Sequence, residues 1–99
     1  MTDKQLIRYT RSFRRGILGK RPSNLCCFMV CAPLSTLLEI DGVKNRLVAG
    51  HFEGCEHFWI ELEDGRALDP TADQFNDYGH EPLPDVYLGK PTVIHGKRA

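Results

Sequence analysis

The sequence contains no run of about eighteen apolar residues, the length that a helix needs to cross a bilayer. Its first residues carry charges where a secretory signal peptide requires an apolar segment. An excess of charge of one sign is also missing, because 13 Lys and Arg residues balance 13 Asp and Glu residues. Balanced charge gives no reason to expect a nucleic acid or an acidic membrane as the partner. We therefore expect a cytoplasmic protein that does not bind membranes.

With 99 residues, the chain also lacks the length for a second domain, and it contains no internal repeat or low-complexity tract. We expect one domain over residues 1–99. Residues 1–21 would form a basic helix and linker, and residues 22–99 a core that holds the candidate catalytic residues. The pattern calls for no cofactor and leaves the oligomeric state open.

The charges are unevenly distributed along the chain. Residues 1–21 hold seven basic residues and one acid, Asp3, whereas residues 53–85 hold ten acids and one base, Arg66. A basic segment can recognise an acidic or phosphate-bearing partner. We rank higher the alternative that this segment is a solvated helix face packed near the acidic half of the chain. A variant of the first idea is nucleic-acid binding through Arg8, Arg11, Arg14 and Arg15.

Two helices are predicted in the first part of the chain. Apolar residues at a helical spacing favour an amphipathic helix from Asp3 to about Leu18, with Asp3 as its cap and Gly19 as its end. Residues 25–40 are apolar on nearly all sides, and the length of this run favours a buried helix over a strand.

The start of the buried helix has two sequence signals. Ser23 or Asn24, in a turn-forming segment, is suited to cap the helix. Pro33 lies inside the run and should cost a helix interior about 3 kcal/mol. We therefore expect either a bend at Pro33 or a helix start displaced toward it.

The second half of the chain is predicted to form a sheet. β-Branched and aromatic residues favour strands at 43–52, 57–62 and 66–69. Two short apolar groups, at 86–88 and 92–94, suggest edge strands. Helices followed by an antiparallel sheet predict an α+β fold, with the buried helix packed on a small sheet.

The cysteines are candidates for chemistry. In a reducing compartment, a retained thiol serves in packing, metal binding or catalysis. The first turn of a helix stabilises a thiolate, because unpaired amide hydrogens and the helix dipole present positive charge there. Cys26 and Cys27 occupy this position. Cys31 lies one turn further in and is predicted to be a small core residue.

A thiolate nucleophile needs a histidine for proton transfer and an acid that orients the histidine. His57 opens the second predicted strand and Asp69 closes the third. A two-residue turn at 64–65 would place their side chains on opposite faces of the sheet. A three-residue loop with Gly65 in the left-handed conformation instead pairs Asp69 with Trp59. Asp69 and His57 then share a face as diagonal neighbours.

Taken singly, His57 is better explained as a satisfied polar residue at a strand end, and Asp69 as the turn former of an Asp-Pro pair. The runs CFMVCAPLSTLLEIDGV, RLVAG, HFWIELEDGRALDPTADQF and VYLG, however, resemble the transglutaminase-like branch of the papain-like cysteine protease superfamily. The likeness spans residues 25–89. It implies a papain-like minimal core and a thiol hydrolase or acyltransferase that acts on an amide or thioester bond of a peptide or protein substrate.

The same resemblance implies a triad of Cys27, His57 and Asp69. Cys26 is the alternative nucleophile, and Cys27 is preferred for its distance to the glycine that ends the helix. The chain departs from papain in having no glutamine shortly before the cysteine. The oxyanion hole would therefore need the backbone amide of Cys27 together with Asn24 or Ser23. Trp59 is a candidate to cover the site, although we expect its ring to lie in the core.

Two further classes of protein stay open. One is a catalytically silent interaction module that keeps the fold and docks through its basic first helix. The other is a metal-binding module, which the spacings disfavour because they fit no paired C-x-x-C arrangement. Its ligands would come from His51, Cys55, His57, Cys26, Cys27 and Cys31. We expect no metal.

Overall fold

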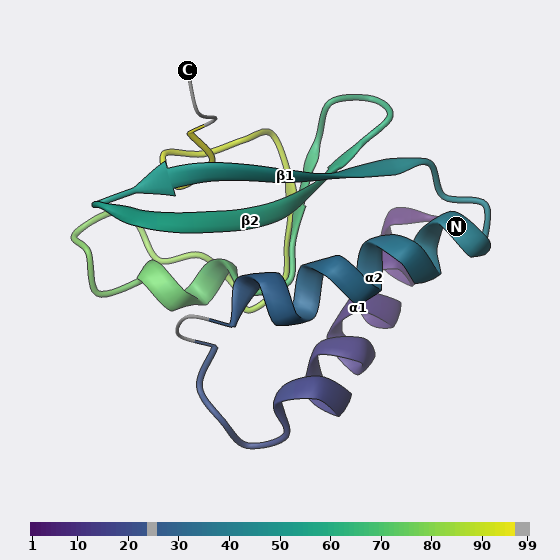
Figure 1. Ribbon diagram of the computed structural model, residues 1–99, viewed down its shortest axis with the longest axis horizontal. Helices are drawn as coiled ribbons and strands as arrows, with labels where there is room; N and C mark the ends of the chain where they lie inside the picture. The colour runs from purple at the N-terminus through teal and green to yellow at the C-terminus, as the bar shows by residue number, and fades with distance from the viewer. Residues whose placement is uncertain (24–25, 97–99) are drawn as a thin grey trace.

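The computed structural model describes residues 1–23 and 26–96. Its elements, in chain order, are α1 (Asp3–Leu18), α2 (Cys27–Ile40), β1 (Asn45–Phe52), β2 (Cys55–Leu62), β3 (Ala67–Asp69), the 3-10 helix η1 (Ala72–Phe75) and β4 (Tyr87–Gly89). The strands form one antiparallel sheet in the order β1-β2-β3-β4 (Figure 1). The predicted α+β class is therefore confirmed. No helix within the described ranges is long and apolar enough to span a bilayer.

The main core lies between α2 and one face of the sheet, and α1 packs against α2 and β4 (Figure 1). Its buried residues come from both helices, two strands and the segment before β4: Leu6, Cys31, Leu34, Leu38, Ile60, Leu62, Leu68 and Val86. A smaller cluster of Ala72, Phe75 and Ile94 lies elsewhere in the core, formed by η1 and the C-terminal turn.

Helix α1 has the predicted range, but its cap differs from the one expected. Thr2, not Asp3, is its cap: the Thr2 hydroxyl accepts the Gln5 amide hydrogen, and the Gln5 side chain accepts the Thr2 amide hydrogen. This reciprocal capping box satisfies two amides, which a cap at Asp3 would not do. Gly19 ends the helix as predicted, with φ of 60°.

Helix α2 runs from Cys27 through Pro33 without a break. A start displaced to Pro33 is therefore wrong, because burial of Val30 and Leu34 on either side of the proline outweighs its intrinsic cost. The N-cap is Cys26, whose side chain makes no capping bond. Ser23, a predicted cap, instead donates its hydroxyl hydrogen to Asp73 at 2.7 Å. Asn24 lies outside the described residues.

The end of the sheet differs from the prediction in one element. The edge strand expected at 86–88 is present as β4, but residues 92–94 are not a strand. The His95 amide hydrogen bonds to the Thr92 carbonyl at 3.0 Å, and this turn folds the segment back instead of extending it.

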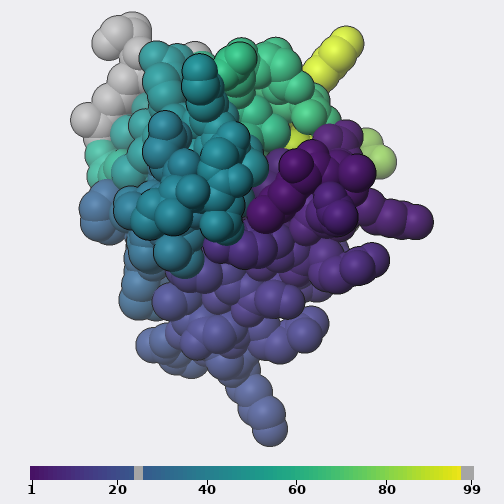
Figure 2. Space-filling view, turned by 90° about the vertical axis from the view of Figure 1, so that its right-hand side faces the viewer, coloured from purple at the N-terminus to yellow at the C-terminus, as the bar shows by residue number. Residues whose placement is uncertain are grey.

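The basic helix packs against the acidic half of the chain, as the higher-ranked interpretation has it. Arg11 forms an ion pair with Asp85 at 3.0 Å, and Arg14 forms one with Asp73 at 2.8 Å. Seen from the side in Figure 2, α1 in purple makes up a large part of the molecular surface. Two of the arginines considered for nucleic-acid binding are thus engaged within the chain.

The β2–β3 register is the one that a triad requires. Ile60 pairs with Leu68, and Glu61 pairs with Ala67, which aligns Trp59 with Asp69. The Gly65 amide bonds to the Leu62 carbonyl at 3.0 Å. Gly65 itself has φ of 88°. The three-residue loop with a left-handed glycine is confirmed.

This loop gives a first testable prediction. A Cβ at Gly65 would meet nothing within 4 Å, so only the backbone conformation opposes a side chain there. Gly65→Ala should lower the free energy of unfolding by about 1 kcal/mol, because φ in the left-handed region disfavours alanine. Chemical denaturation measures the change.

The matched control is Gly16→Ala in α1, where a Cβ also meets nothing within 4 Å. Gly16 is helical, so the same substitution should stabilise the protein by about 0.5–1 kcal/mol. Changes of the same sign at both positions would contradict the proposed role of Gly65.

Candidate active site

Cys27 is the first residue of α2, where the helix leaves its amides without intrahelical partners. The side chain is 5% exposed. Burial alone raises the pKa of the Cys27 thiol, but a hydrogen bond with His57 and the backbone amides of Phe58 and Phe28 more than offset it, so the net pKa is lowered. Cys27 thus occupies the electropositive environment that activates a thiol.

His57 and Asp69 meet as the register requires. Both side chains are fully buried, and His57 Nε2 lies 2.7 Å from Asp69 Oδ2. With Nε2 directed at the carboxylate, Nδ1 is the ring nitrogen on the other side, and the Gln74 side chain lies 3.3 Å from it. Burial lowers the pKa of His57, but its bonds with Asp69 and Cys27 raise it to about 9. His57 and Asp69 are thus in direct contact, and Cys27 is close enough to His57 for each to shift the pKa of the other.

Asp69 accepts hydrogen bonds from three parts of the chain. Besides His57, the Thr71 amide donates to Oδ1 at 3.0 Å, and His95 Nε2 lies 2.8 Å from Oδ2. Burial raises the pKa of Asp69, but the bonds with His57 and His95 outweigh it and lower the pKa to about 2. The carboxylate is therefore charged at neutral pH and held by fixed donors.

His95 is the site residue that the sequence did not reveal. The Thr92 amide donates to His95 Nδ1 at 2.9 Å. Because Nδ1 accepts, the ring proton lies on Nε2 and is donated to Asp69. His95 is therefore a neutral donor that orients the carboxylate. The only sequence signal for it is the Thr-x-x-His spacing of the turn, within a segment that was predicted as a strand.

Aromatic and amide side chains surround His57. The Phe75 ring packs edge-on at 5.0 Å between centroids, and the Trp59 ring lies at 5.6 Å. Gln74 Nε2 is 3.3 Å from His57 Nδ1 and donates to the Thr71 hydroxyl at 2.9 Å. Trp59 is 1% exposed, so it belongs to the interior and does not roof an open site.

The other cysteines lack the surroundings of Cys27. Cys26 is partly exposed, and its thiol lies 3.9 Å from the Pro22 carbonyl. Cys31 is buried and donates to the Phe58 carbonyl at 3.4 Å. Burial raises the pKa of Cys31 well above its usual value, which suits the predicted core role. The geometry thus favours Cys27 over Cys26 as the nucleophile.

Arg14 connects α1 to the segment after Asp69 and, through Asp73, to the segment before α2. Its guanidinium donates to the carbonyl of Pro70, directly after Asp69, at 2.9 Å. It also binds Asp73, which accepts the hydroxyl hydrogen of Ser23 before α2. The Ser23 hydroxyl hydrogen is thereby used within the chain.

A metal centre fits the donor set poorly. Within residues 1–23 and 26–96, the grouped ligand atoms belong to His57, Asp69 and His95 and lie within 4.8 Å of one another. His51 and Cys55, expected in the metal alternative, are not among them. A histidine on a metal donates its other ring N–H to an acceptor. His95 Nδ1 faces the Thr92 amide, which is itself a donor.

Comparisons with protein-family models, with curated proteins and with solved structures find no match to this chain.

The role of His95 gives a second prediction. His95→Phe removes one donor from the buried Asp69 and should lower the free energy of unfolding by about 1–3 kcal/mol. The same change at the exposed His51 should stay within about 0.5 kcal/mol. Denaturation of the two variants measures the difference. Equal effects would mean that Asp69 does not need the second histidine.

Proposed function

We propose that the protein is a cysteine-dependent hydrolase or acyltransferase, related to the transglutaminase-like branch of the papain-like superfamily. Its substrate would be an amide or thioester bond of a peptide or protein. The observation that carries the proposal is the buried His57–Asp69 pair, at 2.7 Å, beside a thiol at the start of a helix. The resemblance of residues 25–89 to that branch supports the same assignment.

In the first half of the reaction, the Cys27 thiolate attacks the substrate carbonyl and forms a carbon–sulfur bond. The carbon–nitrogen bond then breaks, and His57 Nδ1 gives its proton to the departing amine. For a thioester substrate, the departing group is a thiol. Asp69 stabilises the positive charge on His57 before this transfer and fixes the orientation of the imidazole ring.

In the second half, neutral His57 accepts a proton from water or from an acceptor amine. The oxygen or nitrogen attacks the thioester carbon, the carbon–sulfur bond breaks, and Cys27 returns as a thiolate. Water gives hydrolysis or deamidation, and an amine gives acyl transfer. The backbone amide of Cys27, at the first position of α2, supplies one donor for the oxyanion.

A silent interaction module is the second candidate, and one observation favours it. Cys27 is only 5% exposed, and His57 is fully buried, so a substrate carbonyl has little access to the thiol in this conformation. The two candidates differ in whether the thiol is activated. An activated thiol needs the intact His57–Asp69 pair, whereas a docking module does not.

The proposal includes a cytoplasmic location. All four cysteines are unpaired, and a catalytic thiol depends on a reducing compartment to remain so.

The third prediction tests activation of the thiol. Iodoacetamide labelling, mapped by mass spectrometry, should modify Cys27 faster than the more exposed Cys26 and Cys55 at a pH below the usual thiol pKa of about 8.5. His57→Ala should abolish that preference, because the thiol then loses the partner that lowers its pKa. His51→Ala is the matched control and should leave the preference unchanged.

Thiolate absorbance in the ultraviolet, compared between wild type and Cys27→Ser, provides a readout that needs no access for a reagent. A low-pH absorbance step that is present in the wild type and missing from the variant supports the triad. Labelling that follows exposure alone, together with no such step, would favour the silent module.

A further inference from the structure

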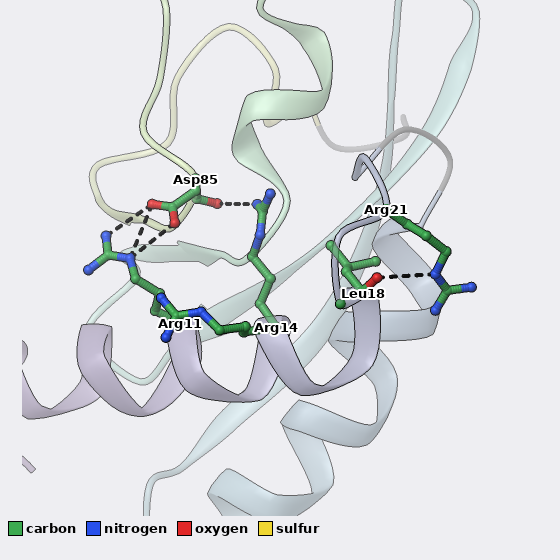
Figure 3. A pocket seen from close by; sticks show the side chains of 7 residues that line it. Arg11, Arg14, Leu18, Arg21 and Asp85 are labelled. Carbon is green, nitrogen blue, oxygen red and sulfur yellow. Dashed lines mark hydrogen bonds and ion pairs between the residues drawn. The ribbon is translucent and has the colours of Figure 1, made fainter.

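A small basic pocket lies at the C-terminal end of α1, apart from the triad. It has a volume of about 110 Å³. Its walls carry four arginines and a single acid, and Figure 3 shows the labelled side chains around it. The full lining is Arg11, Arg14, Arg15, Leu18, Gly19, Arg21 and Asp85.

Two of the arginines are fixed by carboxylates of the chain. Arg11 binds Asp85 through two nitrogens, with its Nε 3.0 Å from Oδ2 and its Nη2 3.0 Å from Oδ1. Arg14 binds Asp73 in the same two-pronged manner and also donates to the Asp85 carbonyl at 2.9 Å (Figure 3). These contacts make one wall rigid, and they neutralise its charge.

The other two arginines, Arg15 and Arg21, form no ion pair with an acid among residues 1–23 and 26–96. Arg21 donates to the carbonyls of Leu18 and Ile17 at the end of α1, and so keeps its full charge (Figure 3). Among the described residues, Arg15 has no hydrogen bond or ion pair from its side chain. The pocket therefore holds two uncompensated guanidinium charges beside a fixed arginine wall.

We propose that this pocket binds a phosphate group, either inorganic phosphate or a phosphate monoester of a small molecule. Two uncompensated positive charges match a dianion, and guanidinium groups recognise phosphate oxygens by paired hydrogen bonds. The volume has room for several water molecules and therefore for one tetrahedral group. Gly19, with φ of 60°, places no side chain over the opening.

The site is independent of the thiol chemistry and does not need an active triad. The proposal also makes the expected partner of the basic helix more specific: a phosphate group bound at one end of the helix. Only the C-terminal end of α1 forms this pocket, and Arg8 lies outside its lining. An extended nucleic-acid surface would instead draw on the whole helix, Arg8 included.

The fourth prediction is tested by calorimetry and by two-dimensional NMR on the full chain, with inorganic phosphate or O-phosphoserine as the probe. Ionic strength is matched with sodium chloride. We expect saturable binding of both probes, with shifts confined to residues of the pocket. The tighter probe identifies the source of the phosphate. Arg15→Gln and Arg21→Gln should each weaken binding about tenfold or more.

Arg8→Gln is the matched control, since it removes the same charge from the same helix, and it should change the affinity less than about twofold. Circular dichroism verifies that each variant is folded. If Arg21→Gln unfolds the end of α1, Arg15→Gln still provides the test, because the Arg15 side chain makes no hydrogen bond or ion pair within the described residues. Equal losses for Arg8→Gln and Arg15→Gln, or acetate binding as tightly as phosphate, would overturn the proposal.

Discussion

The buried carboxylate of Asp69 is the constraint on which the rest of the site depends. A charged group without solvent is costly unless donors surround it, and here the donors come from separate segments of the chain. His57 belongs to β2, Thr71 precedes η1, and His95 closes the C-terminal turn. The bonds with His57 and His95 hold the pKa of Asp69 low in spite of its burial. The same hydrogen bonds to Asp69 therefore hold the second half of the chain together and orient His57.

Strand β3 ends at Asp69, which is bonded to His57 and lies close to the start of α2. Pro70 has no amide hydrogen and cannot extend the ladder beyond Asp69. At that end of β2, the backbone of Phe58 is close enough to influence both α2 cysteines: its carbonyl accepts from Cys31, and its amide lowers the pKa of Cys27. The end of β3 at Asp69 and the contacts of Phe58 with α2 therefore lie in the same part of the sheet.

Much of this arrangement was predictable from local sequence signals. The glycine at position 65 determines the loop length, the loop determines the register, and the register places Asp69 beside His57. Such signals act over a few residues, where turn chemistry has few solutions. The capping of α1 by Thr2 was also local, but Asp3 offered a competing cap.

The contribution of His95 could not be predicted in the same way. It lies 26 residues from Asp69, and only tertiary folding brings the C-terminal turn to the carboxylate. The contacts of Arg14 with Pro70 and Asp73 are more remote still, at 56 and 59 residues. The sequence shows that Asp69 is a candidate for burial near a turn. It does not show which residue from a distant segment donates hydrogen bonds to it.

The most direct test of the account is an NMR titration of the His57 imidazole in the wild type and in Cys27→Ala. The interaction with Asp69 and Cys27 should give His57 a pKa of about 9, against about 6.5 for an unperturbed histidine. Loss of the thiol should lower that pKa, because one of the groups that stabilise the imidazolium is gone. A His57 that titrates near 6.5 in the wild type, and is indifferent to Cys27, would contradict the assembled triad.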